Sequence, residues 1–113
     1  MKTRRQVLER DIAKVKAELV ALGDLRPGTL SKQYNVCGTP GCRCKATPPH
    51  KHGPYYQLSY TRKGKSRTRF VRREHEPTIT HQLRNYVRMR KLVDRWFDLA
   101  EELSELRLDD KAD

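Results

Sequence analysis

A cluster of cysteines and histidines occupies the middle of the chain. Cys37, Cys42 and Cys44 fall within eight consecutive positions, and His50 and His52 follow shortly after them. An odd number of cysteines excludes a fully paired disulfide framework within one chain. Zinc is held most often by four thiolate or imidazole ligands in a tetrahedron. The cluster therefore predicts a zinc site built from the three cysteines and one histidine.

The residues around the cysteines suit a compact metal-binding loop. Tight turns are favoured by the residues that separate the first two cysteines, namely Gly38, Pro40 and Gly41. Gly53-Pro54 fixes the chain directly after His52, so His52 is the preferred fourth ligand and His50 is the alternative. The expected metal ligands are Cys37, Cys42, Cys44 and His52.

Two other interpretations of the cluster stay open, because its spacing lacks the CxxC pair of common zinc modules. One is a redox-sensitive loop with three free thiols. The other is a catalytic metal, which needs an open coordination position and a nearby carboxylate as general base. No acidic residue occurs between Arg26 and Arg73, and the first His-Glu neighbours are Glu74, His75 and Glu76. The pattern favours a structural site, and we expect no enzymatic activity.

The basic charge of the chain is concentrated around this cluster. The whole sequence carries 25 Lys and Arg against 14 Asp and Glu, which gives a formal net charge of +11. A basic surface binds polyanions because phosphates release their condensed counterions when it does so. We therefore expect a nucleic acid, DNA or RNA, as partner. The residues expected to contact it are Arg43, Lys45, Arg62, Lys63, Lys65, Arg67, Arg69, Arg72 and Arg73.

Two segments inside the basic region have the composition of β-strands. Aromatic, β-branched and hydroxyl residues fill positions 55–61 and 66–71, and a turn around Lys63-Gly64 separates them. Period-two alternation places Arg67 and Arg69 on the face opposite Phe70. We therefore expect an antiparallel hairpin that packs one face and presents arginines on the other.

Tyrosines are frequent in the first of these strands. Alternation places Tyr56, Leu58 and Tyr60 on one face and Tyr55 on the other. Packing against the helices is the preferred role for the tyrosines. The alternative is that Tyr55, Tyr56 or Tyr60 stacks on exposed bases.

Helical periodicity flanks the basic region on both sides. In residues 4–23 the apolar positions recur at steps of four and three and form one narrow seam, made of Leu8, Ile12, Val15, Leu19 and Leu22. In residues 77–108 two neighbouring apolar rows form a wider stripe. One row is Leu83, Tyr86, Val93, Phe97 and Ala100, and the other is Leu92, Trp96, Leu99, Leu103 and Leu106. Thr78 or Thr80 is the expected N-cap. This second helix is basic near its start and acidic toward its end.

These elements predict a mainly helical α+β fold in a single domain spanning residues 1–113. A helix over residues 4–23 leads into a zinc-knuckle and two-stranded hairpin module over 27–75, and a long helix over 77–108 follows. A hydrophobic fraction of only 35% leaves little apolar material for a core, so a metal and helix pairing must add stability. We expect the helices to pair as an antiparallel hairpin, or the longer helix to form a coiled-coil homodimer.

No apolar run approaches the roughly 20 residues that a membrane-spanning helix needs. The chain begins with Met1-Lys2-Thr3-Arg4-Arg5 and passes directly into a helical pattern, without the apolar stretch of a secretory signal. We therefore expect a cytoplasmic protein that has no membrane partner.

Several short motifs resemble those of a prokaryotic family. They are Ser31-Lys32-Gln33-Tyr34, Cys37-Gly38, Pro40-Gly41-Cys42-Arg43-Cys44, His52-Gly53-Pro54-Tyr55-Tyr56 and Gly64-Lys65. Over Pro27 to Leu108 they resemble a family of small basic proteins defined only as a domain of unknown function. The resemblance implies no activity. It implies a setting in mobile genetic elements, and it supports His52 as the fourth ligand because His52 lies in a matching motif.

Two functions are compatible with these features. The first is a nucleic-acid-binding accessory protein whose zinc knuckle supports a basic hairpin that contacts phosphates. The second is a subunit or inhibitor that docks on a larger nucleoprotein complex, such as a transposase, a recombinase or a CRISPR effector. The acidic end of the last helix favours the second, because it would repel DNA and attract a basic protein surface.

Overall fold

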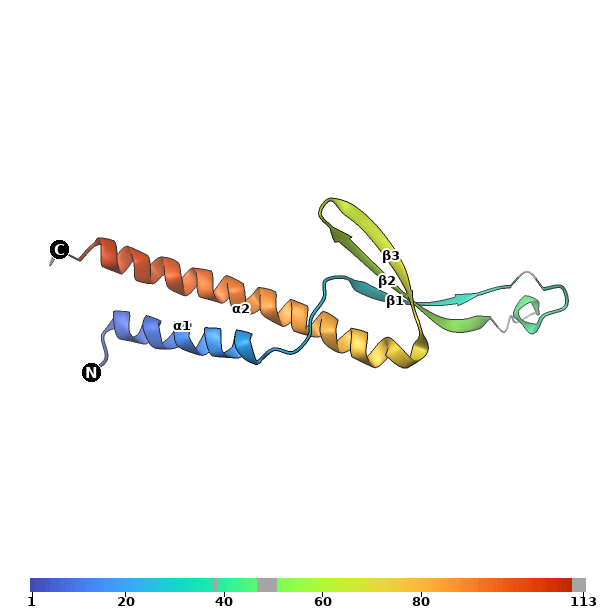
Figure 1. Cartoon of the computed structure of the whole chain (residues 1–113), viewed down its shortest axis with the longest axis horizontal. Coiled ribbons are helices and arrows are strands. Elements are labelled where there is room, and N and C mark those ends of the chain that lie inside the picture. The colour runs from blue at the N-terminus through green and yellow to red at the C-terminus, as the bar shows by residue number, and fades with distance from the viewer. Residues whose placement is uncertain (38, 47–50, 111–113) are drawn as a thin grey trace. The chain divides into compact units, whose positions relative to one another are not determined.

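The computed structural model describes residues 1–37, 39–46 and 51–110. Its elements, labelled in Figure 1, are helix α1 (Arg4–Ala21), strands β1 (Thr29–Asn35), β2 (His52–Arg62) and β3 (Lys65–Val71), and helix α2 (Glu76–Leu108), with short 3-10 turns at Arg43–Lys45 and Arg73–His75. Neither described helix is long and apolar enough to cross a lipid bilayer. The predicted mainly helical α+β fold is confirmed.

The chain forms two compact units. One unit, the helical unit, contains α1 and α2 from Arg84 onward, and the other, the sheet unit, spans Arg26–Leu83. The sheet unit therefore contains all three strands, both 3-10 turns and the first residues of α2.

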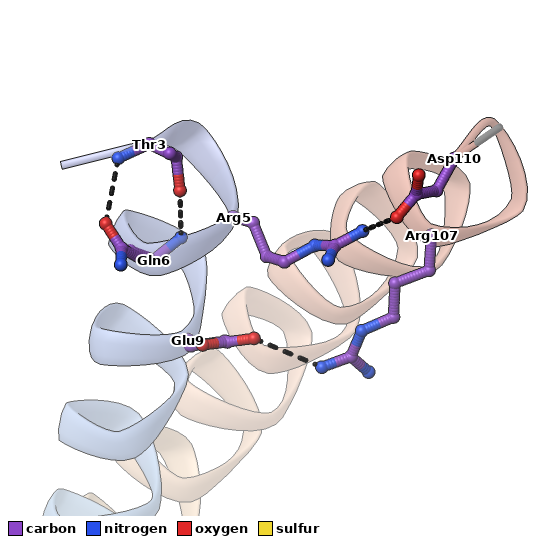
Figure 2. A network of polar contacts seen from close by, with 6 residues as sticks. All are labelled: Thr3, Arg5, Gln6, Glu9, Arg107 and Asp110. Atoms are coloured by element: carbon purple, nitrogen blue, oxygen red, sulfur yellow. Dashed lines mark hydrogen bonds and ion pairs between the residues drawn. The ribbon is translucent and has the colours of Figure 1, made fainter. Parts of the chain in front are cut away.

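Helix α1 begins with a capping box. The backbone N–H of Gln6 donates to Oγ1 of Thr3 (3.2 Å), and the backbone N–H of Thr3 donates to Oε1 of Gln6 (3.1 Å), as Figure 2 shows. Two of the backbone donors left unpaired at a helix start are thereby satisfied. The helix ends at Ala21, two residues before the predicted end, and Leu22 forms its C-cap.

The two helices of the helical unit pack as the predicted antiparallel hairpin (Figure 1). The narrow seam of α1 meets one of the two apolar rows of α2, and the buried residues are Leu8, Ile12, Val15, Leu92, Leu99 and Leu103. Fully burying one such side chain stabilises the folded state by about 1.5–3 kcal/mol. The other apolar row of α2 stays partly open to solvent, because Phe97 is 65% exposed.

Ion pairs join the two helices in their antiparallel arrangement. Arg5 contacts Asp110 at 3.1 Å, and Arg107 contacts Glu9 at 3.3 Å (Figure 2). Nε and Nη2 of Arg4 donate to the two carboxylate oxygens of Glu102. Exposed pairs of this kind add little stability, but they occur only when the helices run in opposite directions. They also occupy two carboxylates of the acidic end of α2 within the chain.

The sheet of the sheet unit has the order β1-β2-β3, and both neighbouring pairs are antiparallel. The predicted hairpin is present as β2 and β3. Its two-residue turn has positive φ at Lys63 (53°) and Gly64 (76°), the combination that matches the twist of the flanking strands. Strand β1 was not predicted from the sequence. It adds to the free edge of β2, with Leu30 opposite Leu58.

Paired residues of an antiparallel sheet lie on the same face. One face, the Leu58 face, comprises Leu30, Lys32, Tyr56, Leu58, Tyr60, Arg62, Lys65, Arg67, Arg69 and Val71. The opposite face, the Phe70 face, comprises Thr29, Ser31, Gln33, Tyr55, Gln57, Ser59, Thr61, Ser66, Thr68 and Phe70. The interior of the sheet unit lies on the Leu58 face, where Leu58 is fully buried and Val71 is 6% exposed.

The expectation that the arginines lie opposite the packed face was wrong. Arg69 pairs with Leu58 and Arg67 pairs with Tyr60, so both arginines share the packed face and extend from it into solvent. Phe70 lies on the opposite face and is 61% exposed. The alternation itself was correct. The buried residue of β3 is Val71 rather than Phe70, and this reverses the assignment of the faces.

The predicted N-cap of the second helix was also wrong. Helix α2 begins at Glu76, directly after the 3-10 turn Arg73–His75, so Thr78 and Thr80 lie inside the helix. The hydroxyl of Thr80 donates to Oε1 of Glu76 at 3.0 Å. Pro77 is tolerated in this first turn because its missing N–H has no helical acceptor there.

Candidate metal centre

Four side chains converge at one end of the sheet unit. The Sγ atoms of Cys37, Cys42 and Cys44 and a ring nitrogen of His52 all lie within 4.8 Å of one another. A tetrahedral zinc with bonds of about 2.3 Å to sulfur separates two sulfur ligands by about 3.8 Å. The four predicted ligands are therefore close enough to hold a metal ion.

Two close contacts hold the cluster together. Sγ of Cys37 lies 3.5 Å from Sγ of Cys44, and Sγ of Cys42 lies 3.1 Å from Nε2 of His52. The backbone N–H of Cys37 also donates to Sγ of Cys44 at 3.3 Å. This hydrogen bond by itself lowers the pKa of Cys44, but burial has the larger effect and raises it.

A tight turn brings Cys42 back toward Cys37. The backbone N–H of Cys42 donates to the carbonyl of Thr39 at 3.4 Å, with Pro40 and Gly41 between them. Proline suits the second position of a type II turn, and glycine suits the third, which needs a positive φ. Gly41 has φ +74°, which matches this pattern. Gly38, to which the sequence assigned a similar role, lies outside the described residues.

A short 3-10 turn then carries Cys44, the buried cysteine of the cluster. The turn spans Arg43–Lys45, with Cys42 as its N-cap, and the backbone N–H of Lys45 donates to the carbonyl of Cys42 at 3.0 Å. Cys44 is fully buried, while Arg43 and Lys45 on either side of it are exposed. The turn therefore directs its thiol inward and its two cations outward.

The sheet supplies the fourth candidate ligand. His52 is the first residue of β2 and pairs with Asn35 of β1, beyond an irregularity in the strand register. Gly53 follows with φ +143°, and a Cβ at this position would lie 2.8 Å from the carbonyl oxygen of Gln33. Only glycine allows this close approach, so Gly53 helps to place His52 beside the cysteines. His50, the alternative ligand, lies outside the described residues.

The electrostatics of the cluster favour thiolates at Cys37 and Cys42 and a thiol at Cys44. The Thr39 backbone N–H, with support from the neighbouring thiols, lowers the pKa of Cys37 to about 6. A backbone hydrogen bond from Cys44 lowers the pKa of Cys42, whereas burial raises the pKa of Cys44. Hydrogen bonding to Cys42 raises the pKa of His52 above its ordinary value. The sulfur atoms thus attract positive charge, which a bound cation would supply in place of the proton on His52.

The predicted phosphate-contacting residues are all exposed and belong to the sheet unit. Two flank Cys44, five lie in the hairpin and two follow it, namely Arg43, Lys45, Arg62, Lys63, Lys65, Arg67, Arg69, Arg72 and Arg73. Two of them, Arg69 and Arg72, also line a pocket of about 460 Å³ together with Arg26 and His75. No carboxylate lines this pocket.

Two features of the sheet unit were not identified from the sequence. The guanidinium of Arg26 lies over the ring of Tyr60 at 5.2 Å, and its buried Nε has no hydrogen-bond partner among the described residues. On the Phe70 face, the rings of Tyr55 and Phe70 lie 6.2 Å apart and are tilted by 47°. Strand alternation alone does not predict the second contact, because this contact also requires the register in which Gln57 lies opposite Phe70.

Comparison with known proteins identifies the family of the chain. No curated protein and no solved structure matches it. A family model described as a domain of unknown function, DUF6788, matches residues 2–81, which include α1, the candidate metal centre and the whole sheet. The match begins earlier than the resemblance of the motifs suggested, because it includes the first helix, and it ends at residue 81 and not at Leu108, so most of α2 lies outside it. Since the model covers more than half of the sequence, the chain belongs to the DUF6788 family.

Proposed function

We propose that this protein is a non-enzymatic, zinc-stabilised nucleic-acid-binding protein that contacts phosphates through its sheet unit. The observation that carries the proposal is the distribution of charge in this unit. Arg26 to Arg73 contains twelve lysines and arginines and no aspartate or glutamate. Nine of these cations are the exposed residues named above.

Zinc is the metal that fits the donor set best. Three thiolates and one imidazole make a soft tetrahedral set, which suits zinc better than the hard cations magnesium and calcium. Four protein ligands also fill the coordination shell and leave no position for a substrate or a water. The metal in this proposal therefore has a structural role. It ties the loop that carries Cys37, Cys42 and Cys44 to β2 through His52.

Phosphate binding follows from the chemistry of the exposed side chains. Arginine presents a fork of N–H donors that matches phosphate oxygens, and lysine adds a mobile point charge. The pocket lined by Arg26, Arg69 and Arg72 offers several donors to one anion. Contacts to phosphates position a protein on a nucleic acid without reading its sequence.

The proposal is tested by the salt dependence of binding to random-sequence DNA and RNA. The logarithm of the affinity should fall linearly with the logarithm of the salt concentration. The triple variant Lys65→Gln, Arg67→Gln, Arg69→Gln should lower the slope by about 2–3 units. A matched control, Lys14→Gln, Lys91→Gln, Arg95→Gln, removes the same charge from exposed positions of the helical unit. It should change the slope by much less. Absence of binding at low salt would overturn the proposal.

A second candidate function rests on a groove of the helical unit. The groove has a volume of about 540 Å³ and is lined largely by Ile12, Ala13, Trp96, Ala100, Leu103 and Leu108. In this alternative the protein is a subunit or inhibitor that accepts an apolar helix of a larger nucleoprotein complex, or of a second copy of the chain, in the groove. Such docking would persist at high salt. Replacing Trp96 by alanine should abolish it, and the charge variants should not.

A further inference from the structure

The Phe70 face is an exposed sheet surface that contains aromatic rings and no charge. Its ten residues are Thr29, Ser31, Gln33, Tyr55, Gln57, Ser59, Thr61, Ser66, Thr68 and Phe70. Phe70 is 61% exposed and Tyr55 is 36% exposed. A large aromatic side chain gains nothing for the fold when it stays in water, so this exposed pair suggests a ligand.

The two rings are placed to accept flat ligands. The ring centroids of Tyr55 and Phe70 are 6.2 Å apart with an interplanar angle of 47°, which makes them a tilted pair and not a parallel stack, and both side chains are exposed to solvent. Tyr55 comes from β2 and Phe70 from β3, and the hydrogen bonds of the sheet hold both strands. The backbone positions that carry the two rings are therefore held before any ligand arrives, which lowers the entropic cost of binding.

Polar groups that can hydrogen-bond to bases lie next to the rings, because Gln33 pairs with Tyr55 and Gln57 pairs with Phe70. Gln33 donates from Nε2 to Oε1 of Gln57 at 3.0 Å, and the hydroxyls of Ser59 and Thr68 are exposed in neighbouring strands. Amide and hydroxyl groups both donate and accept hydrogen bonds, as the edges of bases do. Uncharged polar groups around aromatic rings suit a base better than they suit a phosphate.

The cations of β3 lie beside this surface, on the same strand. Arg69 and Phe70 are consecutive, so their side chains leave opposite faces of one strand. Strand β3 is an edge of the sheet, with no neighbour beyond it among the described strands. A nucleic acid that lies along this edge can place its phosphates against Arg67 and Arg69 and its bases on Phe70. Only single-stranded nucleic acid exposes its bases in this way.

We propose that the Phe70 face is a stacking surface for single-stranded nucleic acid, with Tyr55 and Phe70 each receiving one base. The inference rests on the proposed function and makes it more specific. The protein should prefer single strands over duplexes, because paired bases cannot reach the rings. Stacking accepts every base, so the preference should depend only weakly on sequence.

The test compares a single-stranded oligonucleotide with the corresponding duplex at one salt concentration, using DNA and RNA in separate arms. Phe70→Leu keeps apolar bulk and removes the aromatic face. It should weaken single-strand binding about 5- to 100-fold, and the double variant Tyr55→Leu, Phe70→Leu should weaken it further. Phe70 also lines the pocket that contains Arg26, Arg69 and Arg72, so duplex affinity should change much less than single-strand affinity without being strictly constant. The salt slope should stay unchanged, because no cation is removed. The matched control is Phe97→Leu, because Phe97 is also highly exposed (65%) but lies in the helical unit.

A second measurement does not depend on the stability of the leucine variants. Phe70→Trp adds an indole to the surface, and the natural protein, which contains only Trp96, provides the background. A single strand should quench the added fluorescence, whereas a duplex should not. The stacking surface would be overturned if Phe70→Leu kept its single-strand affinity or if Phe70→Trp showed no quenching. Salt-dependent binding of the natural protein would still uphold phosphate binding in that case. Failure of the natural protein to bind any nucleic acid at low salt would overturn both.

Discussion

Sγ of Cys42 lies 3.1 Å from Nε2 of His52, and this contact joins the cysteine loop to the first residue of β2. Replacing His52 by alanine should lower the zinc content from about one ion per chain to well below that value, because three thiolates leave the tetrahedron incomplete. Elemental analysis of the purified protein measures this. His75→Ala is the control, since His75 is exposed and contacts Glu74 instead of the cluster. A full zinc content in His52→Ala would place the fourth ligand elsewhere.

Removal of the metal should affect the two units differently. The helical unit has its own core around Leu8, Leu92 and Leu99, whereas Cys44 is the only buried residue among the described positions 37, 39–46, 51 and 52. A strong chelator should therefore abolish the protection from hydrogen exchange around residues 39–46 and leave most of the helical circular dichroism signal intact. Loss of both signals in one transition would show that the metal supports the whole chain.

Replacing Gly53 by alanine should distort the candidate metal centre, because Gly53 directly follows His52. The new Cβ would meet the carbonyl oxygen of Gln33 and Cδ1 of Tyr34, both at 2.8 Å, and φ at this position is +143°. Strain and overpacking together should destabilise the sheet unit by at least about 2 kcal/mol and weaken zinc binding.

The control for this prediction is Gly64→Ala in the hairpin turn. Gly64 also has positive φ, but a Cβ there would meet nothing within 4 Å. This variant should lose about 1 kcal/mol and keep its zinc affinity. Chemical denaturation and zinc titration of the two variants separate the effects, and equal zinc affinities would contradict a positioning role for Gly53.

The pair between Arg4 and Glu102 should make the helical unit sensitive to acid. The hydrogen bond from Arg4 lowers the pKa of Glu102 below its ordinary value of 4.5. A lowered pKa in the folded state means that the pair stabilises the fold above about pH 5, and that this stabilisation is lost as the pH falls through the folded-state pKa. Glu102→Gln should therefore melt at most a few degrees lower than the natural protein at pH 7 and at a similar temperature near pH 3. Thermal melts across this range measure the difference, and a constant gap would contradict the prediction.

The helices could be predicted because each has a clear apolar repeat. Leu8, Ile12 and Val15 follow the period of a helix, and the structure buries all three. The start of α2 could not be predicted, since the 3-10 turn Arg73–His75 runs directly into the helix and no capping side chain marks the boundary. Thr78 and Thr80 are typical N-cap residues, but they come too late in the chain.

Strand β1 could not be recognised because its own sequence has no β-pattern. Leu30 and Ser31 are half-buried, while Lys32, Gln33 and Tyr34 are all exposed, so burial does not alternate along the strand. Its conformation depends on pairing with β2, which is a tertiary interaction. The candidate metal ligands were easier to predict, because the chemistry of cysteine and histidine restricts the possibilities before any fold is known.

The position of β3 at the edge of the sheet has a consequence for solubility. An edge strand presents unpaired backbone groups, and these can recruit a strand of another molecule and start aggregation. Lys65, Arg67 and Arg69 give this edge a dense positive charge, so two copies of it repel each other. The cations that would attract a nucleic acid thus also keep the protein chains apart, and variants that neutralise them should be checked for self-association before their binding is measured.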